Sequence, residues 1–138
     1  SQAVTVEEAQ EELALTLDLI APYEITYPVV YDWERMPADR EARTHEVTGE
    51  TLTAMAAAFC RGVEEAGYTP AVYANQNLAY LTLDLSQLKA WPFWLAQYSS
   101  APTFYYRYDL WQYSHTGTVP GIQGNVDLNL AFRDFTQK

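Results

Sequence analysis

Two acidic residues two positions apart are the strongest chemical feature of the sequence. Asp32 ends the run Tyr27–Asp32, which is rich in β-branched and aromatic residues and predicts a short buried strand, and Glu34 follows after Trp33. Side chains two positions apart on a strand point the same way, with Cα atoms about 6.6 Å apart. Such close carboxyls favour one protonated acid and one carboxylate, which is the equipment of a glycosidase. The alternative is a solvated strand end without chemistry.

A third carboxylate lies in the run Gly124–Asn129. Asp127 and Asn129 are two positions apart, so they share one face of the strand predicted near residues 125–128. At the end of a strand, Asp127 could orient a substrate group. The alternative is a turn aspartate that accepts hydrogen bonds from nearby backbone N–H groups.

Aromatic rings and amides recur in two similar runs, 94–98 and 111–113. Rings can stack on sugar faces and amides can bond sugar hydroxyls, so both runs suit a carbohydrate cleft, although strand aromatics more often build a core. The candidate binding residues are Trp94, Gln97, Tyr98, Trp111 and Gln112. The loop 99–108 is also dense in tyrosine, which suits a sugar-binding lip or a contact surface.

Other reactive residue types give no recognisable site. The only cysteine, Cys60, excludes an internal disulfide and a cysteine-based zinc site, and its place on an inward helical face predicts a small core residue. His45 and His115 have no partner at a metal-ligand spacing and are expected on the surface. Phosphate-binding loops, dinucleotide fingerprints and nucleophile elbows are absent from the sequence.

The elements that must position the carboxylates alternate along the chain. Hydrophobic periodicity predicts helices near 5–20, with a Thr5/Glu8 capping box, and near 49–66, capped by Thr48 and closed by Gly67. A short helical stretch is expected between 76 and 89, and residues 35–48 are expected to form a loop. Further strands are predicted at 70–74, 91–97, 110–113 and near 125–128. Such alternation implies parallel crossovers and an α/β fold, and the strands are too few to close an eight-stranded barrel.

Composition limits the function classes. The 138 residues favour one domain, spanning 1–138, and 49% apolar residues are enough for a core. A formal net charge of −10 disfavours binding to nucleic acid and to anionic membrane surfaces. No apolar run approaches the roughly 20 residues of a membrane span, so membrane insertion is not expected. The opening Ser1-Gln2-Ala3 is not a signal sequence and indicates a processed, trimmed or excised product.

Several runs, in this order, resemble glycoside hydrolase family 25, the bacterial and phage lysozymes. The runs are Tyr27–Glu34, Ala66–Ala74, Phe93–Tyr98, Leu110–Ser114 and Val119–Asn129. The resemblance implies an irregular (β/α)8-like TIM barrel and an N-acetylmuramidase that hydrolyses the β-1,4 bond between N-acetylmuramic acid and N-acetylglucosamine. It also implies bacterial peptidoglycan glycan strands as partner, no metal or organic cofactor, and an extracellular or cell-wall location, reached by secretion or phage release.

The family motif also implies roles for individual residues. Glu34 would be the general acid, and Asp32 would orient or polarise the substrate N-acetyl group in a retaining route. Asp127 matches the acidic residue of the last barrel strand, and Tyr73, Trp94, Gln97 and Trp111 fall on strands that line the family's cleft.

The chain departs from the family pattern at its start. The first three strands of the family barrel, including one that supplies another active-site aspartate, have no counterpart here, so the chain corresponds to the C-terminal part of the catalytic domain. A separate or preceding N-terminal segment, or a second copy of the chain, could complete the barrel. The alternatives to a muramidase are a non-catalytic truncated barrel that binds wall glycan or a partner, and a hydrolase of other β-linked sugars.

Overall fold

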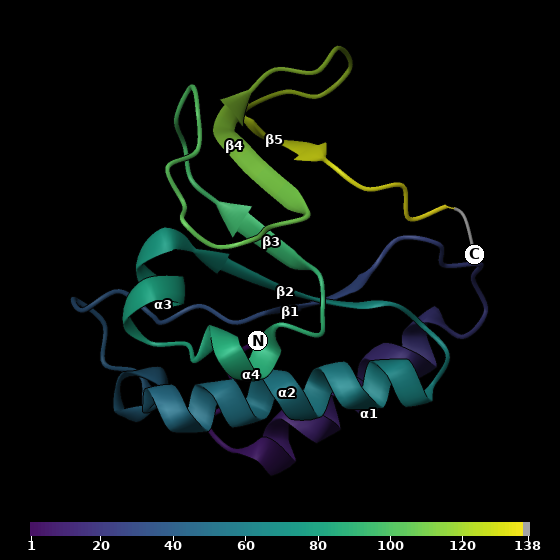
Figure 1. Ribbon diagram of the computed structural model, residues 1–138, viewed down its shortest axis with the longest axis vertical. Helices are drawn as coiled ribbons and strands as arrows, with labels where there is room; N and C mark the ends of the chain where they lie inside the picture. The colour runs from purple at the N-terminus through teal and green to yellow at the C-terminus, as the bar shows by residue number, and fades with distance from the viewer. Residues whose placement is uncertain (137–138) are drawn as a thin grey trace.

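The structure, a computed structural model, describes residues 1–136 as a curled sheet with its main helices on one face (Figure 1). Along the sheet the strands follow their order in the chain. They are β1 (Val29–Asp32), β2 (Pro70–Asn75), β3 (Phe93–Ala96), β4 (Leu110–Gly117) and β5 (Val126–Ala131). All the predicted strands are therefore present, with bounds shifted by a few residues. Within the described residues β1 and β5 are the edges of an open sheet.

The first four strands are mutually parallel, as the alternation of strands and helices predicts. The last strand differs, because β5 pairs antiparallel with β4. Only residues 118–125 join these two strands, and a parallel crossover needs about a dozen residues or more. Gly121 and Gly124, with φ of +90° and +95°, turn the chain back on itself. As a result, the start of β5 lies at the same edge of the sheet as the carboxyl end of β4.

Helix α1 (Val6–Ile20) begins at the predicted cap. The Thr5 hydroxyl accepts a hydrogen bond from the Glu8 backbone N–H at 3.2 Å. The Glu8 carboxylate reaches one residue further back than a standard capping box, and accepts from the Val4 N–H at 2.9 Å.

Helix α2 (Gly49–Glu65) packs against β1 and β2 and also against α1. Its buried stripe includes Leu52, Met55 and Phe59, with Cys60 beside them, as the periodicity predicts. Beyond the helix, Gly67 has a φ of +86°, the left-handed conformation expected of a C-terminal cap.

The predicted helical stretch after β2 divides into two short helices, α3 (Gln76–Leu81) and α4 (Leu85–Leu88). The expected loop 35–48 contains one turn of 3-10 helix, η1 (Arg43–Glu46). Among residues 1–136, none of the helices has the length and hydropathy needed to cross a membrane.

Candidate active site

The end of β1 presents Asp32 and Glu34 on the exposed side of the chain. Exposure alternates here, because Tyr31 and Trp33 are buried whereas Asp32 and Glu34 are exposed. The Trp33 indole N–H donates to the Ala3 carbonyl oxygen at 2.8 Å, which anchors the segment from the core side. Alternation along an extended chain therefore directs the two carboxylates away from the core and toward the same side.

The backbone around the carboxylates is held by two further contacts. The ammonium group of Ser1 donates to the Asp32 carbonyl oxygen at 2.5 Å, and the Gln2 amide donates to the Glu34 carbonyl oxygen at 3.2 Å. On the other side of Glu34, the Arg35 guanidinium donates to the carbonyl oxygens of Thr44, His45 and Val47 at 2.8–3.0 Å. These contacts fix the main chain and leave the carboxylates themselves accessible.

Glu34 lines a cavity of about 390 Å³ at the carboxyl edge of β1 and β2. Tyr73 forms part of its wall, together with side chains of the β2–α3 junction that the sequence did not single out, namely Asn75, Asn77 and Leu81. Asn75 caps α3 by accepting from the Leu78 N–H at 2.8 Å. A strand that runs directly into a capped helix is the sequence signal that could have located these residues.

Tyr73 lies beside the carboxylates. It is the register partner of Asp32 on β1 and of Trp94 on β3, and its ring meets the Trp94 indole edge-on with centroids 5.1 Å apart. Burial raises the pKa of its phenol well above the usual value, and the nearby Tyr98, Glu34 and Asp32 raise it further. Tyr73 therefore remains a neutral phenol.

Gln112 is buried and bonded to two phenols. Its Oε1 accepts from the Tyr73 hydroxyl at 2.8 Å and from the Tyr98 hydroxyl at 2.9 Å. Only 5% of Gln112 is exposed, whereas Tyr98 is half exposed and packs against the His115 ring with centroids 4.2 Å apart. The predicted residues Tyr73, Tyr98 and Gln112 are thus brought together as one hydrogen-bonded cluster.

Trp94 and Asn129 also meet across the sheet, because the Trp94 indole N–H donates to Asn129 Oδ1 at 3.0 Å. Asp127 lies further along. The row of register partners that starts at Asp32 reaches β5 at Ala131, and Asp127 lies four residues before it, about 13 Å along the strand direction at roughly 3.3 Å per residue. The structure does not pair Asp127 with either acid of β1.

Trp111 and Gln97 have partners within the protein. Trp111 is 7% exposed, packs in the hydrophobic core, and donates its indole N–H to the Gln97 carbonyl oxygen at 2.8 Å. The Gln97 amide holds the following loop, since it donates to the Thr103 hydroxyl at 2.8 Å and accepts from the Thr103 N–H at 3.1 Å. Both residues thus have polar atoms bonded within the protein, and their contact with substrate stays a prediction.

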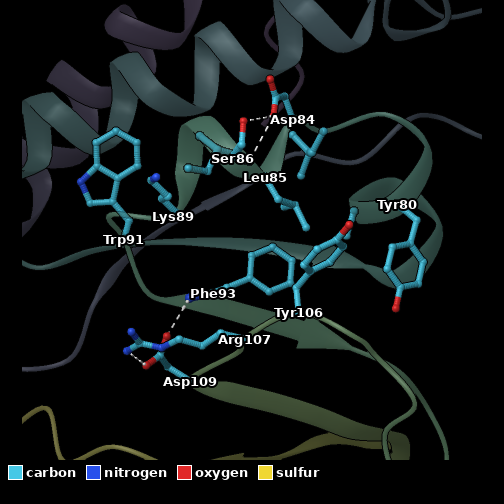
Figure 2. Close-up of a pocket in the computed structure, with 13 residues that line it drawn as sticks. Tyr80, Asp84, Leu85, Ser86, Lys89, Trp91, Phe93, Tyr106, Arg107 and Asp109 are labelled. Carbon is cyan, nitrogen blue, oxygen red and sulfur yellow. Dashed lines mark hydrogen bonds and ion pairs between the residues drawn. The ribbon is translucent and has the colours of Figure 1, made fainter.

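A second and larger cavity, of about 510 Å³, lies apart from the carboxylates (Figure 2). It runs between α4 and the segment that leads into β4, with Tyr80 toward one end and Trp91 toward the other. Its floor is stabilised by buried Asp109, which accepts from the Arg107 guanidinium at 2.7 Å and from the Phe93 N–H at 3.3 Å. The tyrosine-rich loop 99–108 contributes Tyr106 and Arg107 to this cavity, and Glu34 is not among its lining residues.

No cluster of three or more His, Cys, Asp or Glu side chains that could hold a metal ion occurs in residues 1–136. His45 contacts the Met36 carbonyl oxygen at 2.9 Å, and His115 is exposed. Cys60 is buried as predicted, and burial raises the pKa of its thiol to about 12. None of these side chains joins the carboxylate site.

Known proteins match both the sequence and the fold. Residues 2–122 match the family model described as glycosyl hydrolases family 25. Among curated proteins, none matches the chain.

The crystal structure of the CTP1L endolysin is 28% identical with a TM-score of 0.72, and the match covers 94% of this chain and 44% of that one. The modular autolysin LytC from Streptococcus pneumoniae is 25% identical with a TM-score of 0.73, and the match covers 92% of this chain and 31% of that one. The spore cortex lytic enzyme SleM of Clostridium perfringens, at 20% identity, shares the fold with a TM-score of 0.75. The match covers 95% of this chain and 46% of that one. The chain spans less than half the length of each.

Proposed function

The chain belongs to glycosyl hydrolases family 25. From this premise we propose that it carries the general acid and a supporting carboxylate of a peptidoglycan-hydrolysing active site. The proposed reaction is hydrolysis of the β-1,4 bond between N-acetylmuramic acid and N-acetylglucosamine, as in a lysozyme. The proposed place of action is the bacterial cell wall, outside the cell. The observation that carries the proposal is that exposed Glu34 lines a cavity together with Tyr73, a neutral phenol whose register partner is Asp32.

In this proposal Glu34 is the general acid. A general acid must reach the leaving oxygen, and Glu34 is exposed and lines the 390 Å³ cavity. Its backbone is held on both sides, by Gln2 at its carbonyl and by the clamp of the neighbouring Arg35, so the carboxyl is presented from a fixed point. Loss of such an acid costs on the order of 10²–10⁴ in rate.

Asp32 is proposed to stabilise charge at the reacting sugar. In a retaining route assisted by the substrate, the N-acetyl oxygen attacks the anomeric carbon, and a carboxylate orients that group and balances its developing positive charge. Asp32 rises from the same side of the strand end as Glu34, which suits this division of roles. Asp127 is proposed as a more distant member of the acidic cluster, acting on substrate groups further along the cleft.

The proposed glycan-binding surface follows the strand ends from β2 to β5. Tyr73, Trp94, Tyr98 and Asn129 offer ring edges and polar atoms along this line. Trp111, Gln97 and Gln112 are also proposed to contribute to this surface, and a polar atom of each is bonded within the protein. No cofactor is part of the proposal.

We also propose that the open edge of β1 receives the strands that complete the family's barrel, from a preceding segment or from a second copy of the chain. The support is that β1 is an edge strand among the described residues and that the chain covers 44% of the CTP1L endolysin. The intact mass and the oligomeric state of the native protein distinguish the two sources.

The proposed function is tested with Glu34→Gln. This change keeps the size and removes the proton donor, so release of new reducing ends from purified peptidoglycan should fall by at least about 10². The matched control is Glu64→Gln on the exposed face of α2, which should retain the wild-type rate. Full activity of Glu34→Gln would overturn the assignment. Wall binding by the wild type without any turnover would instead favour a glycan-binding module.

A further inference from the structure

The cavity of about 510 Å³ takes no part in the proposed hydrolysis, yet it has the features of a ligand site (Figure 2). Its volume lies within the roughly 300–1,000 Å³ of small-ligand sites, which combine apolar and aromatic walls with a few polar groups. The rings of Tyr80, Phe93 and Tyr106 line it. Tyr80 is 40% exposed and Tyr106 is 52% exposed, and their ring centroids lie 6.0 Å apart. A ligand that enters the cavity therefore meets an accessible aromatic surface.

The two ends of the cavity differ in chemistry. In Figure 2 the ends of the Lys89 and Arg107 side chains lie toward Trp91. The rings of Tyr80 and Tyr106 lie toward the opposite end. The whole chain has only 8 lysine and arginine residues against 18 acidic ones, so two basic side chains in one cavity are a local concentration of positive charge. The cavity thus has a cationic end and an aromatic end.

The carboxylates in the cavity lining already have partners. Asp84 Oδ1 accepts from the backbone N–H and the hydroxyl of Ser86, at 3.0 and 2.6 Å. Asp109 is only 6% exposed, and its two oxygens accept from the Arg107 guanidinium at 2.7 Å and from the Phe93 N–H at 3.3 Å. Because both acids are bonded within the protein, neither requires a cation from a ligand.

The basic side chains, in contrast, have unused donors. Among residues 1–136 the ammonium group of exposed Lys89 makes no hydrogen bond and no ion pair. Arg107 has five N–H donors, and the structure engages only its Nη2, with Asp109. Buried Asp109 thereby holds the guanidinium at the cavity wall, and the remaining donors of the planar fork match a carboxylate. The cationic end therefore suits a ligand carboxylate.

We propose that this cavity binds the acidic peptide stems of peptidoglycan, with a stem carboxylate at the cationic end and alanine methyl groups against the aromatic end. The inference rests on the proposed function, because action on the wall is what brings stems to the protein. Stems suit the cavity since they carry carboxylates beside small apolar side chains, whereas a neutral sugar would leave both cations unmatched. The net charge of −10 repels an anionic polymer at long range, so the two cations act at contact.

The test is a titration of the full protein with muramyl dipeptide, N-acetylmuramyl-L-alanyl-D-isoglutamine, followed by amide chemical shifts in two-dimensional NMR. This probe carries one carboxylate and no glycosidic bond to cleave. The shifts should concentrate around residues 83–93 and 104–109. Lys89→Gln removes one charge from an exposed side chain, so it should weaken binding by about three- to tenfold. The same loss is expected when the carboxylate of the probe is converted to an amide.

The second basic residue is tested with Arg107→Lys, because a lysine can still balance the buried Asp109 carboxylate. The lysine lacks the planar fork, so the affinity for muramyl dipeptide should again fall by about threefold or more. The matched control is Arg61→Gln on the exposed face of α2, which removes the same charge outside the cavity lining. It should leave the affinity unchanged.

Equal affinity of the wild type and Lys89→Gln, or of the acid and its amide, would overturn the proposal. Shifts confined to the Glu34 cavity would also overturn it. Equal shifts around 83–93 and 104–109 with the trimer of N-acetylglucosamine would indicate a site for uncharged sugar and reject the peptide stem. The result is separate from the proposed function, because the probe contains no bond to hydrolyse. Carboxylate-dependent binding without hydrolysis of peptidoglycan would sustain this site and reject the catalytic assignment, and hydrolysis without such binding would do the reverse.

Discussion

Asp32 and Tyr73 are register partners on the neighbouring parallel strands β1 and β2. Register partners in a parallel pair project from the same face of the sheet, so the carboxylate and the phenol are neighbours at its carboxyl edge. The negative charge of Asp32 is one of the causes that raise the pKa of the Tyr73 phenol, after burial, Tyr98 and Glu34. This relationship places a persistently neutral phenol within an acidic site.

Replacement of Asp32 should affect both rate and phenol titration. Asp32→Asn keeps the shape and removes the charge, so kcat on peptidoglycan should fall by roughly 10²–10³ through lost electrostatic stabilisation. The same variant should lower the pKa of Tyr73, because a charge that disfavours the phenolate is gone. Asp18→Asn, on the exposed side of α1, is the control and should change neither quantity. Wild-type kcat in Asp32→Asn would contradict the role of this residue.

Arg35 should contribute to the stability of the folded state through the hydrogen bonds that its guanidinium group donates. Its guanidinium donates to three backbone carbonyl oxygens of the segment 44–47. The Lys ammonium is a compact donor that does not match this planar fork, so Arg35→Lys should lower the free energy of unfolding by about 1–3 kcal/mol in thermal or denaturant unfolding. Arg61→Lys on the exposed face of α2 should cost close to nothing. Equal stability of the two variants would show that the fork is dispensable.

Gly49 should tolerate no side chain. A Cβ at this position, the first residue of α2, would lie 2.3 Å from the Thr82 carbonyl oxygen, so either α2 or the turn after α3 must shift. Gly49→Ala should therefore cost about 1–3 kcal/mol of unfolding free energy. The comparison is Gly67→Asn, where the backbone is left-handed, nothing lies near the added Cβ, and asparagine is tolerated, so the cost should stay below about 1 kcal/mol. The reverse order of costs would refute the close approach.

Salt should help the protein act on anionic walls. The formal net charge is −10, so an anionic polymer is repelled at low ionic strength and the repulsion is screened as salt is added. Turnover of intact walls should rise between low and moderate salt, whereas turnover of a small neutral glycan fragment should change little. A steep fall with salt on intact walls would indicate attraction through a local basic surface instead.

Local patterns predicted the elements of the fold well. The capping residues Thr5 and Thr48 begin α1 and α2 as expected, because caps and apolar periodicity depend on residues close in sequence. The direction of β5 was harder to predict from the sequence, since it depends on whether residues 118–125 form a turn or a crossover. Their two glycines with positive φ favour the turn, and they carry the local signal for it.

The site was predictable where strand alternation could be applied. Asp32 and Glu34 follow it, with Trp33 buried between them. The same rule would have separated Trp111 from Gln112, because consecutive residues on a strand face opposite sides, and the structure buries Trp111 in the core while Gln112 bonds the phenols. The cavity residues Asn75 and Asn77 were missed, because a strand that runs directly into a capped helix marks the β2–α3 junction in the sequence but not its place beside Glu34.

The identity of the sugar at the newly formed reducing ends tests the central claim most directly. Peptidoglycan digested by the wild-type protein, with Glu34→Gln in parallel, is reduced with borohydride and hydrolysed, and the sugar alcohols are separated. The account predicts the alcohol of N-acetylmuramic acid from the wild type and almost none from Glu34→Gln. The alcohol of N-acetylglucosamine, or equal amounts of product from the two proteins, would contradict it.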